Sequence, residues 1–273
     1  MPNHVYNLVR MKNIAEKDIF STEDPGCIDF NKLVRMPEVL DVPESSNVSL
    51  SIKAYVLYLR QQIVAQQTTP YSITFSDTMK LQDTLMSIPD ETIKKFQDDV
   101  DKYIEIGMEP FLRSRAFKFI DKDLQEQAMF YNFAEMGRRY LENLFLNGAL
   151  TWYGWSVKNW GTKWNAYDGN IIDNDTIEYY TAWNPAIPIL IELSKQNPMN
   201  EIKLAYMSED PSCAGKMTFY NGEVIQDDEY DYMSYESIEL GKQLLGYNYA
   251  TDMYVYEMDE SPNAFTLINN VKE

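Results

Sequence analysis

The feature that most constrains the fold is a run of four short elements between residues 175 and 226. In three of its segments, β-branched and aromatic residues alternate with polar ones, which predicts strands. Between the first two, a pair of prolines opens an apolar stretch with helical spacing. The predicted elements are a strand at 175–185, a helix at 186–198, a strand at 200–210 and a strand at 216–226, the last containing an Asn221-Gly222 hairpin turn.

A further strand is predicted close to the N-terminus. The segment "HVYNLVRM" alternates and is rich in Val, Leu and Tyr, so residues 4–12 read as a strand. Strand, helix, strand, strand is the later part of a ferredoxin-like arrangement, and the N-terminal strand would supply its missing partner. We therefore predict an α+β protein with a ferredoxin-like antiparallel sheet.

The stretch from residue 48 to residue 149 has a different sequence pattern. It contains long segments with helical spacing and few glycines, and one of its helices is predicted to end at Gly107. This stretch therefore reads as a large helical insertion. The sequence predicts two parts, an α+β domain formed by residues 1–47 and 150–273, and a helical subdomain formed by residues 48–149.

Four short motifs lie in the two outer parts of the chain. They are "PNHV" at 2–5, "DFNK" at 29–32, "NWGTKWNA" at 159–166 and "TAWNP" at 181–185. This pattern resembles that of the YubB-type family of phage- and plasmid-borne proteins, which have a ferredoxin-like domain and no known function. The resemblance implies that fold and a setting in mobile genetic elements. It implies no reaction and supplies no catalytic residue.

Histidine and cysteine usage narrows the chemistry. His4 is the single histidine, so a Ser-His-Asp triad, a Cys-His pair or a multi-histidine metal site would depend on that residue alone. Cys27 and Cys213 are far apart and belong to no CxxC motif, which predicts reduced thiols rather than a zinc site or a disulfide framework. We expect no metal and no cofactor, and a binding protein is favoured over an enzyme.

All five tryptophans fall between residues 152 and 183. Aromatic clusters at this spacing usually form core, so one interpretation is that they pack a helix on the sheet. The alternative is an aromatic cleft for a planar ligand such as a nucleotide. The residues of that candidate cleft are Trp160, Lys163, Trp164, Asn165, Asp168 and Trp183.

Acidic residues dominate the surface charge. The chain has 42 acidic and 24 basic residues and a formal net charge of −18, and residues 221–260 hold eleven acids against one base. Such a charge repels a phosphate backbone, so we expect no direct nucleic-acid binding. A solvated acidic face and a docking surface for a basic partner both fit. The candidate partner-binding residues are Asp227, Asp228, Glu229, Tyr230, Asp231, Tyr232 and Tyr235.

Two other clusters have ordinary structural explanations. Asp168, Asn170, Asp173 and Asp175 lack the spacing of a calcium-binding EF-hand loop, so residues 168–175 read as a solvated loop before a strand. Arginines occur in pairs at 138–139 and at 113 and 115. On helices they are expected to form ion pairs with neighbouring glutamates such as Glu135 and Glu142.

Three hypotheses of different classes remain. The first is a phage or mobile-element accessory protein that binds and inhibits a host protein with a basic surface, for example a component of host defence. The second is a protein that binds or sequesters a nucleotide in the tryptophan-rich cleft. The third is a structural interaction module without a ligand.

No signal peptide or membrane-spanning run is visible, so the expected location is the host cytoplasm. The sequence does not indicate the oligomeric state.

Overall fold

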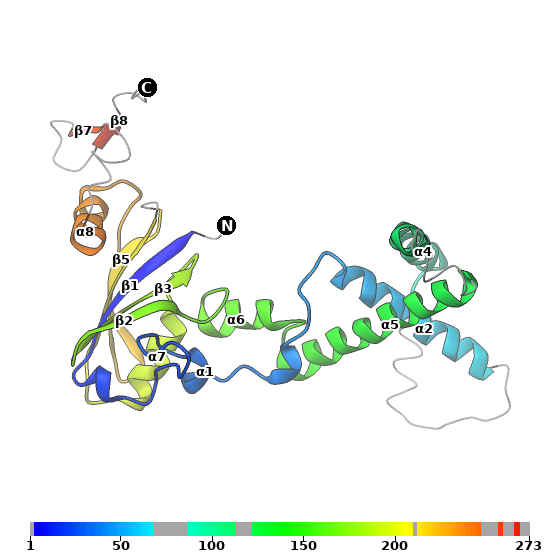
Figure 1. The fold of residues 1–273 in the computed structure, drawn as a ribbon, viewed down its shortest axis with the longest axis horizontal. Coiled ribbons are helices and arrows are strands. Elements are labelled where there is room, and N and C mark those ends of the chain that lie inside the picture. The colour runs from blue at the N-terminus through cyan, green and yellow to red at the C-terminus, as the bar shows by residue number, and fades with distance from the viewer. Residues whose placement is uncertain are drawn as a thin grey trace. The chain divides into compact units, whose positions relative to one another are not determined.

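The structure is a computed structural model that describes residues 3–67, 87–112, 122–209, 212–246, 256–258 and 265–267. The chain forms two compact units (Figure 1). Residues 1–36 and 153–273 form an α+β unit, and residues 37–152 form a helical unit. The helical unit therefore begins 11 residues before the predicted position 48 and ends three residues after the predicted position 149.

The α+β unit contains a six-stranded antiparallel sheet in the order β2-β3-β1-β4-β5-β6. Its strands are β1 (His4–Arg10), β2 (Tyr167–Asp173), β3 (Thr176–Ala182), β4 (Ile202–Ser208), β5 (Ala214–Tyr220) and β6 (Glu223–Glu229). The N-terminal strand β1 lies between β3 and β4 and pairs with both. The predicted α+β class with an antiparallel sheet is therefore confirmed. A separate short pair joins β7 (Tyr256–Met258) to β8 (Phe265–Leu267).

The prediction of a loop at residues 168–175 was wrong. Residues 167–173 form the edge strand β2, which pairs with β3 through a short hairpin. The strand was missed because it pairs on one side only, is largely exposed and has two register shifts, so it lacks the alternation of a half-buried strand.

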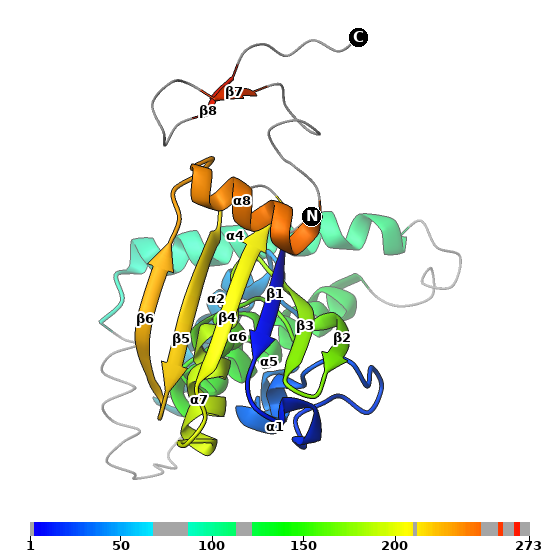
Figure 2. The ribbon, with the colours of Figure 1, turned by 90° about the vertical axis from the view of Figure 1, so that its left-hand side faces the viewer.

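Helices cover the two faces of the sheet unequally (Figures 1 and 2). One face carries Val5, Asn7 and Val9, which are fully buried. Helices on this side include α1 (Phe30–Leu33) and α7 (Ile187–Gln196), which contact each other. The opposite face carries Leu8 and Arg10, which are less buried. There, α8 (Tyr235–Leu245) crosses one end of the sheet and leaves the remainder of that face uncovered by any described helix. We call it the α8 face.

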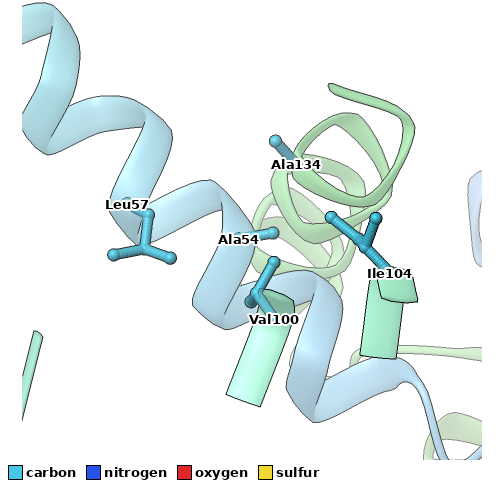
Figure 3. Close-up of a cluster of buried hydrophobic side chains, with 5 residues drawn as sticks. All are labelled: Ala54, Leu57, Val100, Ile104 and Ala134. Atoms are coloured by element: carbon cyan, nitrogen blue, oxygen red, sulfur yellow. The ribbon is translucent and has the colours of Figure 1, made fainter. Parts of the chain in front are cut away.

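The helical unit is built on α2 (Val48–Gln67), α4 (Asp90–Leu112) and α5 (Lys122–Asn147). Helix α4 continues beyond Gly107, so the predicted end at that residue was wrong. Figure 3 shows the buried cluster that joins the three helices, which consists of Ala54, Leu57, Val100, Ile104 and Ala134. Two small alanines in this cluster allow the helix axes to approach closely.

The segment before α2 belongs to the helical unit because α5 binds its backbone. Asn143 Nδ2 donates to the carbonyl oxygen of Val39 (3.0 Å), and Tyr140 Oη donates to that of Pro43 (2.9 Å). Leu40, in a short 3-10 helix, is fully buried. The sequence analysis placed the boundary at residue 47 because these contacts join positions about 100 residues apart, and a local sequence pattern does not reveal such contacts.

The expected ion pairs on α5 are confirmed. Arg138 forms ion pairs with Glu135 (2.6 Å) and with Glu142, and Arg139 contacts Glu135 at 3.4 Å. These pairs lie one helical turn apart and are exposed, so solvent screens them and each contributes little to stability. They explain these two arginines without a ligand. Arg113 and Arg115 lie outside the described residues.

A glycine on α5 gives a test of the helix packing. A Cβ atom on Gly137 would lie 2.0 Å from the carbonyl oxygen of Ser51 on α2. We expect Gly137→Ala to lower the free energy of unfolding by about 1–3 kcal/mol, although alanine is the better helix former. The control is Asn132→Ala, at an exposed site on the same helix, which should be neutral or slightly stabilising. Thermal and urea unfolding would measure both, and equal stability of the two variants would contradict the packing.

Candidate functional site

We use the name tryptophan block for residues 152–166, which contain four of the five tryptophans. The first half of this block is part of the core. Helix α6 (Trp152–Trp160) buries Trp155 and Trp160, whose rings meet edge to face at 5.5 Å. Trp160 Nε1 donates a hydrogen bond to the carbonyl oxygen of Val34 (2.8 Å), and its ring packs against Phe30. Trp160 therefore holds the N-terminal segment against α6 and offers no free ring face to a ligand.

The residues that follow α6 form a tight corner. Gly161 has a φ of +79°, and a Cβ atom there would lie 2.8 Å from Cδ of Pro188, so both conformation and space favour glycine. The Thr162 hydroxyl donates to the carbonyl oxygen of Ala182 (2.7 Å) and accepts from its N–H (3.1 Å). These two bonds attach the corner to the end of β3.

Asn165 links the corner to the N-terminal segment. Its Oδ1 accepts from the N–H of Phe30 (2.9 Å), and its Nδ2 donates to Asp29 Oδ1 (2.8 Å). Asp29 is also the N-cap of α1, where it accepts from the N–H of Asn31. Asn165 is therefore a scaffold residue. Asp168 is exposed on β2 with a φ of +50°.

The remaining candidates form a cation–aromatic cluster. Lys163 Nζ lies 4.7 Å from the ring centroid of Trp164, 5.0 Å from that of Trp183 and 5.9 Å from that of Tyr153. Trp183 is 37% exposed and has a φ of +73°, which is uncommon for a large side chain. The chain's own lysine therefore already occupies a position over these rings that a ligand would otherwise contact.

Sequence reasoning missed Tyr153 as a member of this cluster. Its ring meets that of Trp183 edge to face at 5.9 Å. The two residues are 30 positions apart and come from α6 and the end of β3. The dense aromatic composition around residue 153 was the available signal, but it does not show which rings gather around Lys163.

The structure places the acidic candidates at an edge of the sheet. Strand β6 pairs with β5 on one side and, among the described residues, with no strand on the other. All seven of its residues are exposed, including Val224 and Ile225. Asp227, Asp228 and Glu229 form no ion pair with any described residue, so their charges remain uncompensated by direct contacts.

The tyrosines that follow β6 divide into two kinds. Tyr230 is half-buried and packs against the cluster beneath α8, where burial and the nearby Asp228 and Glu236 raise its pKa. Tyr232 and Tyr235 are exposed, by 62% and 41%. We use the name acidic edge for the exposed set, which consists of Asp227, Asp228, Glu229, Asp231, Tyr232 and Tyr235.

His4 lies on the same sheet, opposite Ala182 at the end of β3. Its Nδ1 is hydrogen-bonded to the Tyr167 hydroxyl, and its Nε2 lies 3.8 Å from Glu209 Oε1. Burial raises the pKa of Tyr167 to about 12, so this phenol stays protonated at neutral pH. Among the described residues these two side chains are its polar partners, and neither is a serine or cysteine nucleophile, so His4 fits a structural link between β1 and β2.

The two cysteines do not form a reactive site in the described part of the chain. Cys27 is buried, and burial together with Asp24 raises its thiol pKa to about 12, which makes it a weak nucleophile. Cys213 is also a free thiol. No group of three or more metal-ligating side chains comes together in the described part of the chain. Among the described helices, none combines the length and apolarity that a membrane crossing requires.

Comparison with known proteins identifies the type of the α+β unit. Residues 159–248 match a family model described as the ferredoxin-like domain in Api92-like protein. This region runs from the end of α6 to just beyond α8, and the match confirms the predicted ferredoxin-like class. The crystal structure of protein api92 from Yersinia pseudotuberculosis aligns with 84% of this chain and 98% of its own, at 12% identity and a TM-score of 0.33. A search of curated proteins found no match.

The corner after α6 can be tested by removing its two hydrogen bonds. Thr162→Val keeps the side-chain shape but leaves the N–H and carbonyl groups of Ala182 without this partner. We expect the free energy of unfolding to fall by about 1–3 kcal/mol. Thr22→Val, at an exposed position of the same unit, should change it by less than about 0.5 kcal/mol. Urea unfolding monitored by tryptophan fluorescence measures both, and a stable Thr162→Val variant would refute the role of the corner.

Proposed function

We propose that this protein is a binding protein that captures a basic partner protein through its acidic edge. One observation carries the proposal: among the described residues β6 is an exposed edge strand with three carboxylates that form no ion pair, and the exposed Tyr232 and Tyr235 lie a few residues beyond it. The geometry therefore brings charge, contact area and an open strand edge to one place.

Each component of the acidic edge has a distinct physical role. The open edge of β6 offers backbone N–H and carbonyl groups that an extended segment of a partner can pair with. Exposed carboxylates accelerate the approach of a basic surface and disfavour acidic ones. Tyr232 and Tyr235 supply rigid contact area that loses little side-chain entropy on binding.

The biological setting that we propose is that of a phage or mobile-element accessory protein. The support is the YubB-type motif pattern, above all the segment at 159–166. In this setting the partner is a host protein with a basic surface, such as a defence component, and occupation of that surface inhibits it. The protein acts in the host cytoplasm by binding, without a cofactor.

A charge-neutralising variant tests the proposal. The triple variant Asp227→Asn, Asp228→Asn, Glu229→Gln removes three charges from exposed positions and leaves side-chain size nearly unchanged. Its matched control is Glu91→Gln, Asp98→Asn, Asp101→Asn, which removes the same number from exposed positions of α4. Because each such charge contributes about 0.5–1 kcal/mol, we expect the acidic-edge variant to bind the partner about 10- to 100-fold more weakly.

The measurement has two stages. Tagged wild-type protein is first used to capture a stoichiometric partner from host lysate, and mass spectrometry identifies it. Calorimetry with the purified partner then compares the wild type and both triple variants at low and high salt. Capture that weakens with salt and with the acidic-edge variant alone supports the proposal. Equal binding by both variants refutes it, and the absence of any partner favours a structural module.

A further inference from the structure

A second surface feature lies on the α8 face of the sheet, outside both clusters described above. Strands β1, β4, β5 and β6 and helix α8 surround a hollow with a volume of about 380 Å³. This is within the range of small-molecule sites, about 300–1,000 Å³. Figure 2 shows this face toward the viewer, with α8 across one end of the strands. The hollow therefore lies on the more open side of the α+β unit.

Three basic side chains from neighbouring strands line the hollow. Arg10 on β1 lies directly across from Lys203 on β4, and Lys216 on β5 is the register partner of Ala205, two positions farther along β4. Lys203 forms an ion pair with Glu201 (3.0 Å), whereas Arg10 and Lys216 form none with any described residue. A backbone hydrogen bond lowers the pKa of the nearby Asp173 carboxyl, and Arg10 lowers it further, so the charge of Arg10 is partly balanced. In a chain with a net charge of −18, three cations that line one hollow mark a local site for an anion.

The rest of the lining is apolar with a few polar groups. Leu8 and Ala205 of the sheet and Leu240 and Leu244 of α8 form an apolar wall. Gln226 is already engaged, because its Oε1 accepts from Thr218 (3.4 Å) and its Nε2 donates to Asp228 (2.6 Å). Gln243 lines the hollow from an exposed position and has no hydrogen bond with a described residue, so its amide is available to a ligand.

We propose that this hollow binds a nucleoside phosphate. Arg10 and Lys216 would hold the phosphate, the apolar wall would contact the base, and Gln243 would bond to a base edge or the ribose. The neighbouring acidic edge favours a small ligand over a nucleic-acid strand, because it would repel a continuing phosphate backbone. The site is distinct from the Lys163 cluster and adds a ligand to the partner binding proposed above.

Calorimetric titration with the four ribonucleoside diphosphates, at low salt, tests the site. Saturable one-to-one binding of at least one nucleotide is expected, with weaker binding of inorganic pyrophosphate. Arg10→Gln and Lys216→Gln should each weaken it about tenfold, because each removes a charged hydrogen-bond donor. Both residues are exposed, so these changes leave the fold intact, which circular dichroism would verify. The matched control is Lys12→Gln, an exposed lysine outside the hollow, which should have no effect.

The inference is overturned if no nucleotide binds at concentrations up to about 1 mM, which corresponds to a binding free energy of about −4 kcal/mol. It is also overturned if neither Arg10→Gln nor Lys216→Gln weakens nucleotide binding. A third contradicting result is that pyrophosphate binds as tightly as every nucleotide. The acidic-edge triple variant separates this inference from the proposed function. It should lose partner capture and keep or strengthen nucleotide binding, because none of its three residues lines the hollow and Asp228, which lies opposite Lys216, would no longer repel a phosphate.

Discussion

The pairing of β1 with both β3 and β4 is the constraint on which the α+β unit depends. This N-terminal strand lies in the middle of the sheet, and its partners come more than 160 residues later in the chain. Its alternating side chains define the two faces. Val5, Asn7 and Val9 are buried on one face, whereas Leu8 and the exposed Arg10 lie on the other. A register slip of one residue would exchange these sets, so the hollow on the α8 face depends on this pairing.

The tryptophan block connects this sheet to the segments around it. Trp160, Thr162 and Asn165 each bond to a different backbone or side-chain group, at Val34, at Ala182 and at residues 29–30. The many polar and aromatic residues of this motif are explained by the number of backbone and side-chain polar groups at this corner that need hydrogen-bond partners. Lys163 and the rings around it are only partly buried. The segment that looked most like a ligand site is therefore chiefly a structural joint.

Acidic and basic residues lie next to each other on neighbouring strands of the sheet. Lys216 on β5 is the register partner of Asp228 on β6, yet the two form no ion pair. Basic residues gather on the α8 face, where Asp228 also lies, whereas Asp227 and Glu229 alternate to the opposite face of β6. An overall charge of −18 hides this arrangement, because composition averages over surfaces that different ligands would contact.

The sequence by itself determined the elements with strong local signals: the strands at 175–185 and 200–210, the helix between them, the N-terminal strand, the α5 ion pairs and the α+β class. The single strand predicted at 216–226 was wrong, because the turn at Asn221-Gly222 divides this stretch into the two strands β5 and β6. Periodicity and turn chemistry act over a few residues, so these features could be predicted. Tertiary structure alone decided the edge strand β2, the attachment of residues 37–47 to α5, the placement of Tyr153 beside Lys163 and the gathering of Arg10, Lys203 and Lys216. Each of these depends on contacts between distant positions, and such contacts leave no local pattern in the chain.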